Sequence, residues 1–418
     1  MFLKKIILPI IILLFGNSMV SMAQNTSSPY SVLGIGDIES SYYNRYTGMA
    51  NSSVALSDNR YINNANAASL TDMVPRFYTF EVSGRFQHVL YSGNAVDLSN
   101  NQTSDMQVKR LNLAVKITKR WGTSLGLLPY STVNYNFVSS KSLEGTQQFA
   151  TATYQGQGGI NQVFWGNGYR ITRNTSIGVT SSILFGSLTQ IETLQTGNDL
   201  NSLVTTSSNF LHNFYFNFSL LSKLKLSKHW ESSYGITFSP RTSLMSQESI
   251  GVTDVTGATI KATKTNNGYF DLPVSINAGI ALVKNNKYTY TINAKNDSWN
   301  DLNYSAQGYQ LVNSNRLSLG FQSSNLKQNY YKQTYEQGFF QLGLYAGNSY
   351  LKVNNEQLTD FGVSMGYGRN SFRSPLGWVA SLSAGRQGSQ NTNIVSQNYL
   401  RLTFTLSYLD IFNSNKKQ

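Results

Sequence analysis

The chain has 418 residues and no cysteine, which excludes disulfide bonds, thiol catalysis and cysteine-based metal sites. Charged residues make up 13% of the chain, aromatic residues another 13%, and the formal net charge is +13. We interpret the basic excess as lysines and arginines in solvent. The alternative is contact with lipopolysaccharide phosphates or an anionic ligand.

The N-terminus has the pattern of a secretory signal peptide over residues 1–23. Lys4 and Lys5 precede an apolar run at residues 6–15, and the small residues Ser21 and Ala23 flank a cleavage position before Gln24. A membrane anchor is the alternative, but the apolar run is about half of the roughly 20 residues that a spanning helix needs. We therefore expect an exported chain, for which nucleic acid is not an expected partner.

Residues 24–75 differ from the remainder of the chain. They are rich in Ser, Asn, Ala and Gly, show little alternation, and include short helix-compatible stretches. A structureless segment of this length is unusual in a compact domain, so we expect it to fold against other parts of the protein. If the chain forms a barrel, the available place is the lumen, and these residues form a hatch, or plug.

From Arg76 onward, candidate strands with period-two alternation follow one another, separated by polar turns. Many of them exceed the five or six residues usual in soluble sheets. Without spanning helices, such a chain can cross a bilayer only as a closed barrel. We predict an all-β fold, a transmembrane antiparallel β-barrel over residues 76–412, in the outer membrane of a Gram-negative cell. The candidate strands lie near 76–91, 108–119, 122–138, 145–155, 160–171, 175–188, 210–226, 230–245, 248–264, 272–284, 287–301, 315–325, 335–349, 356–368, 376–388 and 398–412.

Two longer polar segments, residues 189–209 and 300–314, match extracellular loops, whereas the other turns are short. The last candidate strand, 398–412, is the clearest. Its apolar side chains alternate with Arg401, Thr403, Thr405 and Ser407, so that one face is predicted to meet lipid and the other the lumen. Residues 413–418 are then expected to form a periplasmic tail.

Candidate catalytic residues are few. The chain has three histidines, His88, His212 and His229, and no Gly-x-Ser-x-Gly motif or local acid–base cluster accompanies them. No spacing of His or carboxylate residues predicts a metal site. We expect a protein that is not an enzyme and has no cofactor.

Pro129 stands within the alternating segment 122–137. Proline lacks the N–H donor of a strand ladder and is confined to edges, strand starts or bulges. One interpretation is that a strand starts at Tyr130; the other is a bulge, kink or break that opens the barrel wall sideways. A second local signal is the Asn-rich box at residues 63–70, where Asn66 or Ser69 is a candidate helix cap.

These motifs, in this order, resemble the FadL-type family of outer-membrane transporters for long-chain fatty acids and other hydrophobic compounds. The box with Asn64, Asn66, Ala67, Ser69 and Leu70 is similar to the family's Asn-Pro-Ala-x-Leu element, with Ala67 in place of proline. The segment with Gly126, Pro129 and Tyr130 resembles its Gly-x-x-x-Pro-Tyr/Phe strand. Residues 299–304, 316–321 and the closing strand fit as well.

The resemblance implies a barrel of about 14 strands, a hatch inside it, and a wall opening at the kinked third strand. It predicts passive uptake of a hydrophobic ligand, with lateral release into the bilayer. The ligand path would include the hatch box residues, Gly126, Pro129 and Tyr130, and Arg401 is a candidate partner for a carboxylate. The family also includes barrels that serve secretion or surface-assembly machines, so a non-transporting barrel that docks envelope proteins is the alternative. Expected partners are outer-membrane lipid and lipopolysaccharide, a hydrophobic small molecule, and other envelope proteins.

Overall fold

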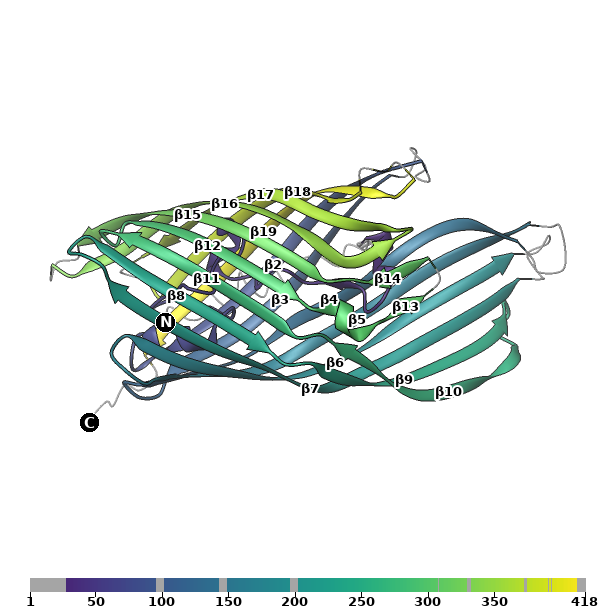
Figure 1. Cartoon of the computed structure of the whole chain (residues 1–418), viewed down its shortest axis with the longest axis horizontal. Coiled ribbons are helices and arrows are strands. Elements are labelled where there is room, and N and C mark those ends of the chain that lie inside the picture. The colour runs from purple at the N-terminus through teal and green to yellow at the C-terminus, as the bar shows by residue number, and fades with distance from the viewer. Residues whose placement is uncertain are drawn as a thin grey trace, which may run out of the picture.

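The computed structural model describes residues 28–94, 101–142, 149–195, 202–306, 308–328, 332–371, 374–389, 391 and 393–411. The expected signal peptide at 1–23, Phe412 and the tail at 413–418 lie outside these residues. Within them, the chain forms a closed antiparallel β-barrel with a smaller N-terminal segment inside it (Figure 1). No helix in the described ranges has the length and apolar character needed to span a membrane.

The described wall has 14 strands, which confirms the predicted fold class. Two of the 14 are interrupted at the same level, one between β8 and β9 at Pro240 and the other between β10 and β11 at Pro273, because proline cannot donate to the ladder. The strands are β2 (Phe77–Ser92), β3 (Gln102–Lys116), β4 (Trp121–Ser142), β5 (Phe149–Arg170), β6 (Thr175–Gln195), β7 (Leu203–Lys225), β8 (Trp230–Ser239), β9 (Thr242–Asp254), β10 (Thr259–Leu272), β11 (Ser275–Lys284), β12 (Tyr288–Asp297), β15 (Ser314–Gln328), β16 (Thr334–Val353), β17 (Glu356–Asn370), β18 (Leu376–Gly388) and β19 (Ser396–Ile411).

The barrel closes where β19 pairs with β2 along its whole length, from Ser396 opposite Ser92 to Ile411 opposite Phe77. The alternation predicted for the closing strand is confirmed: Leu402 is 45% exposed on the outer face, whereas Thr405 is 1% exposed on the inner face. Period two places every second side chain of such a strand on the same face. The outer face is therefore apolar and the inner face is covered by the N-terminal segment.

The two ends of the barrel differ in their connections. At one end, which we call the turn end, β2 begins, β19 ends, and short turns join β3 to β4, β5 to β6, β7 to β8 and β11 to β12. At the other, which we call the loop end, β9 and β10 reach far beyond the middle of the barrel, on the right of Figure 1. Outer-membrane barrels as a class have short turns on the periplasmic side and longer loops outside, and the two ends of this barrel show the same difference.

Some predicted elements were wrong in their bounds. Segments 145–155 and 160–171 belong to one strand, β5, because Gly158 and Gly159 adopt positive φ and remain in the ladder instead of forming a turn. Segment 248–264 is divided between β9 and β10 by a turn at Gly257, which has φ +87°. Much of the expected loop 189–209 is strand, while segment 300–314 carries the short elements η6 (Trp299–Leu302), β13 (Ser305–Ala306) and β14 (Tyr309–Leu311).

The N-terminal segment lies inside the barrel, as the purple trace in Figure 1 shows. It contains η1 (Pro29–Val32), β1 (Asp37–Ile38), η2 (Arg45–Met49) and η3 (Ala67–Asp72). Its backbone approaches the wall most closely at inward-facing glycines: the carbonyl of Leu70 lies against Gly122, and that of Ala67 against Gly168. A Cβ at either glycine would collide with these carbonyls, so the wall has no side chain there and the plug fits tightly.

Candidate functional site

The wall opens between β3 and β4. These strands pair from Lys116 opposite Gly122 to Leu111 opposite Leu127, and no pairing joins residues 102–110 of β3 to β4 in the described structure. Both strands nevertheless continue toward the loop end, β3 on its β2 neighbour and β4 on its β5 neighbour. The seam between β3 and β4 is therefore closed at the turn end and open above Leu127.

Two bulges lie where the strands part. On β3, Lys109 has no partner between Arg110 and Val108. On β4, Tyr130 has no partner between Pro129 and Ser131. A bulge bends its strand and increases its twist, so facing bulges at one level turn the two strands away from each other. The prediction of a bulge at Pro129 matches this geometry, whereas the alternative of a strand that starts at Tyr130 was wrong.

Side-chain exposure marks the open part of the seam. Met106 and Val108 on β3 are 80% and 71% exposed, whereas Leu113, on the paired part of the same face, is 45% exposed. A lipid-facing side chain in a continuous wall is flanked by neighbours on both sides. The two β3 side chains above the bulge lack the β4 flank, and they face outward at the edge of the opening.

The N-terminal segment covers the β4 side of this opening from within. Asp37 and Ile38 of β1 pair with Thr132 and Ser131 of β4. The next amide, that of Glu39, donates to the carbonyl of the bulged Tyr130 at 3.0 Å. The plug thus supplies a short strand at the place where β3 no longer pairs with β4.

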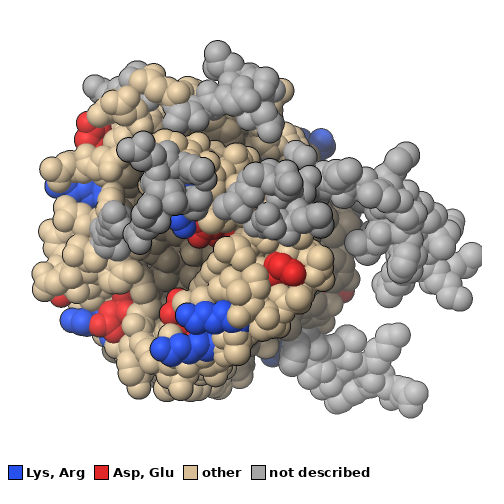
Figure 2. All heavy atoms as spheres, turned by 90° about the vertical axis from the view of Figure 1, so that its right-hand side faces the viewer, with Lys and Arg blue, Asp and Glu red and all other residues tan. Residues whose placement is uncertain are grey.

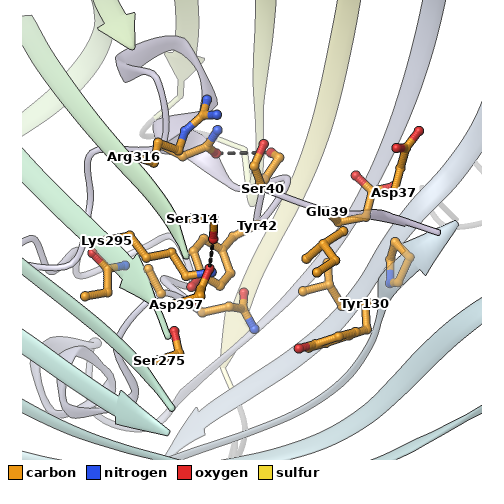
Figure 3. Close-up of a pocket in the computed structure, with 18 of the residues that line it drawn as sticks. Asp37, Glu39, Ser40, Tyr42, Tyr130, Ser275, Lys295, Asp297, Ser314 and Arg316 are labelled. Atoms are coloured by element: carbon orange, nitrogen blue, oxygen red, sulfur yellow. Dashed lines mark hydrogen bonds and ion pairs between the residues drawn. The ribbon is translucent and has the colours of Figure 1, made fainter. Parts of the chain in front are cut away.

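A chamber of about 300 Å³ lies in the lumen behind the seam. Asp105 and Gln107 of β3 line it together with Pro129, Tyr130 and Thr132 of β4, so the chamber is bounded by both sides of the opening. Seen from the loop end, the molecule is hollow at its centre, with acidic and basic side chains close to the hollow (Figure 2). Figure 3 shows Asp37, Glu39 and Tyr130 on one side of the chamber and Lys295 with Asp297 on the other.

Charged groups next to the seam are paired across the plug and the wall. Lys109 Nζ lies 2.7 Å from Glu39 Oε1, and Arg85 lies 3.8 Å from the same oxygen and 3.1 Å from Asp105. Burial alone would raise the pKa of the Glu39 carboxyl, but the positive charges of Lys109 and Arg85 outweigh it and lower the pKa to about 2. Glu39 is therefore ionised and holds the plug against both β2 and β3.

Asp37 is in a different situation in the same segment. Burial raises the pKa of its carboxyl to about 7, although Arg401 and Arg85 favour the charged form. No cation lies within ion-pair distance of Asp37 in the described structure. This carboxyl therefore titrates near neutral pH, while Glu39 does not.

The far wall of the chamber carries further charges. Lys295 lies 3.0 Å from Asp297, which also accepts from Ser314, and Arg316 lies 2.8 Å from Asp360.

Arg401 differs from these basic residues: its Nε donates to Gln87 at 2.9 Å and its guanidinium lies over the Tyr399 ring at 3.8 Å. No carboxylate oxygen lies within 4.0 Å of Arg401 among the described residues.

Toward the loop end, the lumen becomes apolar. Side chains from the plug and from both sides of the barrel form one buried cluster, which includes Ile35, Val133 and Trp299. Aromatic rings dominate its edge: Tyr130 meets Tyr215 edge to face at 5.9 Å between centroids, and Trp299 lies 4.8 Å from Tyr350. The chamber thus has a charged floor near the seam and an apolar roof.

The predicted hatch box lies at the turn end, against the wall. Asn66 caps η3 by accepting from the Ala68 amide at 3.0 Å, and it donates to the carbonyls of Val54 and Leu220. Asn64 accepts from Asn112 at 3.0 Å, and Ser69 donates to the Asn63 carbonyl. With Ala67 and Leu70 against wall glycines, the box fastens the plug to the barrel. Asn64, Ala67 and Leu70 also line the chamber.

Buried ion pairs attach the rest of the plug. Arg110 on β3 and Glu81 on β2 pair at 2.6 Å, are completely buried, and bond the carbonyl and amide of Ile62. Arg45 in η2 pairs with Asp58 of the plug and, at 2.9 Å, with Glu336 of β16. Removing one partner of a buried pair leaves an uncompensated charge, so these contacts hold the plug in one position.

The structure brings together only part of the predicted path. Pro129, Tyr130 and Arg401 line the chamber, whereas Gly126 lies below it, packed against the Leu111 carbonyl and the Phe164 ring. Four residues at the chamber and seam were not predicted from the sequence: Asp37, Glu39, Arg85 and Lys109. Charged residues on the inward face of alternating strands were an available signal for the last two. His88 Nδ1 lies 2.8 Å from the Ser104 hydroxyl, and the His212 ring lies 5.2 Å from that of Phe210. No group of three or more metal ligands occurs in the described ranges.

Comparisons with known proteins agree with this architecture. A family model described as BamG matches residues 2–417. Among solved structures, a Pseudomonas aeruginosa FadL homologue is 12% identical, with a TM-score of 0.59 over 90% of this chain and 100% of that one. The P. putida toluene transporter TodX is 15% identical, with a TM-score of 0.57 over 88% and 99%. The CymD monoaromatic hydrocarbon channel is 13% identical, with a TM-score of 0.57 over 87% and 96%. No curated protein matches the chain. The fold is thus the one implied by the FadL-type resemblance.

Proposed function

The chain belongs to the BamG family, and we propose that it is an outer-membrane channel for the passive uptake of hydrophobic compounds. The observation that carries this proposal is the chamber bounded by the open β3–β4 seam. A ligand would move from the loop end into the chamber and leave through the seam into the bilayer. The hatch closes the turn end, so the side of the barrel offers the shorter way out.

The lining of the chamber limits the class of ligand. The apolar cluster above it favours an aliphatic or aromatic body, while the charged floor favours a polar end group. Arg401 has no carboxylate partner in the described structure and is our proposed contact for an acidic end group, such as that of a fatty acid. Partition of the apolar body into lipid supplies the driving force, without cofactor or catalysis.

Solved structures with this fold include transport proteins. Two of them are described as a toluene transporter and a monoaromatic hydrocarbon channel, which makes a transport role more consistent with this fold than an enzymatic one. At these low identities, the likeness to the two structures shows only that the fold is shared. The proposal for this chain therefore depends on its own seam and chamber.

A reversible lock of the plug strand β1 onto β4, at the edge of the seam, tests the proposal. The chain has no cysteine, so Ile38→Cys with Ser131→Cys introduces one pair of thiols, at directly opposed positions of β1 and β4. Oxidation would fix the plug strand to β4. We expect uptake of a labelled fatty acid by a deletion strain to fall about tenfold and to return after reduction, a change of about 1.4 kcal/mol in barrier.

The matched control is Ser381→Cys with Thr403→Cys, an opposed pair on the inner face of β18 and β19, away from the seam. Its oxidation is expected to leave uptake unchanged. Equal uptake by the reduced and oxidised Ile38→Cys, Ser131→Cys variant, with the disulfide confirmed by mass spectrometry, would refute a lateral route in which the plug strand leaves β4.

A second candidate function, a barrel that docks envelope proteins without transport, is favoured by the shape of the loop end. Among the described strands, β10 pairs with β9 and leaves its other edge unpaired, and residues 259–269 are exposed on both faces. An unpaired strand edge of this length is a template for strand addition by another chain. Thr263→Pro would remove one backbone N–H donor from β10. A cell defect in this variant with normal fatty-acid uptake would favour docking.

A further inference from the structure

An apolar groove crosses the outer surface of β4 to β8 at the turn end. Its walls come from two rows of outward side chains that lie side by side on successive strands. One row runs from Trp121 through Tyr169 and Ile177 to Leu220 and Ile236. The next row runs from Asn167 through Val179 to Phe218 and Phe238.

Aromatic side chains border the turn-end side of this groove. Trp121 donates its ring N–H to Asn167 at 3.1 Å, which holds the indole against the wall. Tyr169, directly opposite Trp121 on β5, is 49% exposed, and its hydroxyl has no hydrogen-bond partner in the described structure. Trp and Tyr at the rim of a barrel mark the level of the lipid headgroups.

Cationic side chains stand at the same rim. Lys119 and Arg120, in the β3–β4 turn, line the groove and are exposed. Neither lies within 4.0 Å of a carboxylate oxygen among the described residues. Three further basic residues in or beside the neighbouring turns also have no ion pair in the described ranges: Arg173, Lys225 and Lys228. The acidic residue nearby in sequence is Glu231.

We propose that this groove binds a diacyl phospholipid with an anionic headgroup in the periplasmic leaflet. The two rows of apolar side chains accommodate acyl chains, and Lys119, Arg120 and the Tyr169 hydroxyl face the level of the phosphate. A lipopolysaccharide is excluded by position, because the groove is at the turn end and lipopolysaccharide occupies the opposite leaflet. The inference goes beyond transport and does not depend on it.

Native mass spectrometry of the full chain in detergent, titrated with phosphatidylglycerol and separately with phosphatidylcholine, tests the inference. We expect wild type to retain phosphatidylglycerol about tenfold more tightly, since each cation at a membrane surface favours an anionic lipid. The double variant Lys119→Gln, Arg120→Gln is expected to lose this preference. Inorganic phosphate, which lacks acyl chains, is expected not to displace the lipid at equal concentration.

The matched control is Lys261→Gln with Lys264→Gln on β10, which removes the same charge from exposed positions at the loop end. A second pair separates the groove from general lipid contact: Val179→Trp fills the groove, and Val363→Trp, on the outer face of β17, does not. Binding that is lost equally in both charge variants, or kept in Val179→Trp, would overturn the proposal. Heat-modifiable mobility on gels verifies that each variant folds.

Discussion

At the turn end, every strand of the described wall is hydrogen-bonded to both neighbours, and the plug lies against glycines of the wall. At the loop end, pairing between described residues is missing at two places, between β3 and β4 and on the far side of β10. The strands there fall into two groups with no pairing between their described residues, and the groups diverge at the right of Figure 1. The same alternating sequence thus builds a closed cylinder at one end and an open mouth at the other.

The difference teaches where a barrel can tolerate an opening. Unpaired backbone groups are expensive in hydrocarbon, so an open seam needs other partners for them. At β4, those partners come from the plug, through β1 and through the Ser31 hydroxyl, which donates to the Asn134 carbonyl. We expect changes at the turn end to act on stability, and changes at the seam to act on transport.

The largest effect is expected from Glu81→Gln at the turn end. It leaves Arg110 buried without its counter-charge, and such a loss costs about 3–5 kcal/mol. Denaturant unfolding of the refolded barrel in lipid vesicles measures it. Lys141→Gln removes an exposed pair with Glu192 at the loop end and is expected to cost less than about 1 kcal/mol. Similar losses for both would contradict the contrast between the two ends.

Gly168→Ala tests the close fit of plug and wall. The new Cβ would meet the Ala67 carbonyl, so we expect a loss of about 1–3 kcal/mol from overpacking, again read from denaturant unfolding. Gly268 on β10 has open space around it, and Gly268→Ala is expected to change stability by less than about 0.5 kcal/mol. If both variants are equally stable, the plug is less tightly seated than the structure indicates.

Pro129→Ala acts at the seam. An alanine supplies the N–H that proline lacks, which favours continued strand pairing beyond Leu127. We expect fatty-acid uptake to fall several-fold, while stability changes by no more than about 1 kcal/mol. Unchanged uptake would mean that the bulge at Tyr130 opens the seam without help from the proline.

The last prediction is a pH dependence at Asp37, which needs no substitution to be observed. Its folded pKa of about 7 is above the ordinary value, so the folded state binds more protons and stability falls as pH rises from about 4 to 7. Glu39 has the opposite sign: its stabilisation is present above its ordinary pKa and is lost toward pH 2. After correction for the base-catalysed intrinsic exchange rate, the protection of the amides of residues 31–39 should therefore be higher at pH 5.5 than at pH 8. Asp37→Asn should abolish this difference.

Sequence patterns predicted the barrel well because alternation depends only on each strand's own side chains. In β19, Leu402 and Thr405 take opposite faces whatever their neighbours are. Strand bounds were less predictable, since Gly158 and Gly159 suit a turn or a strand equally well until β4 and β6 flank them. The hatch box lies in the lumen in the structure, and its hydrogen-bond partners on the wall, Leu220 and Asn112, were not predictable from sequence.

The sequence by itself determined the class of fold, the apolar and polar faces of the strands, the plug and the irregularity at Pro129. Each of these depends on local chemistry: period-two alternation, turn residues and the missing proline N–H. Only the tertiary structure decided that the Lys109 and Tyr130 bulges lie at one level, and that Asp37 and Glu39 reach this level from the plug. These residues are far apart in sequence, and the barrel's closure and register bring them together.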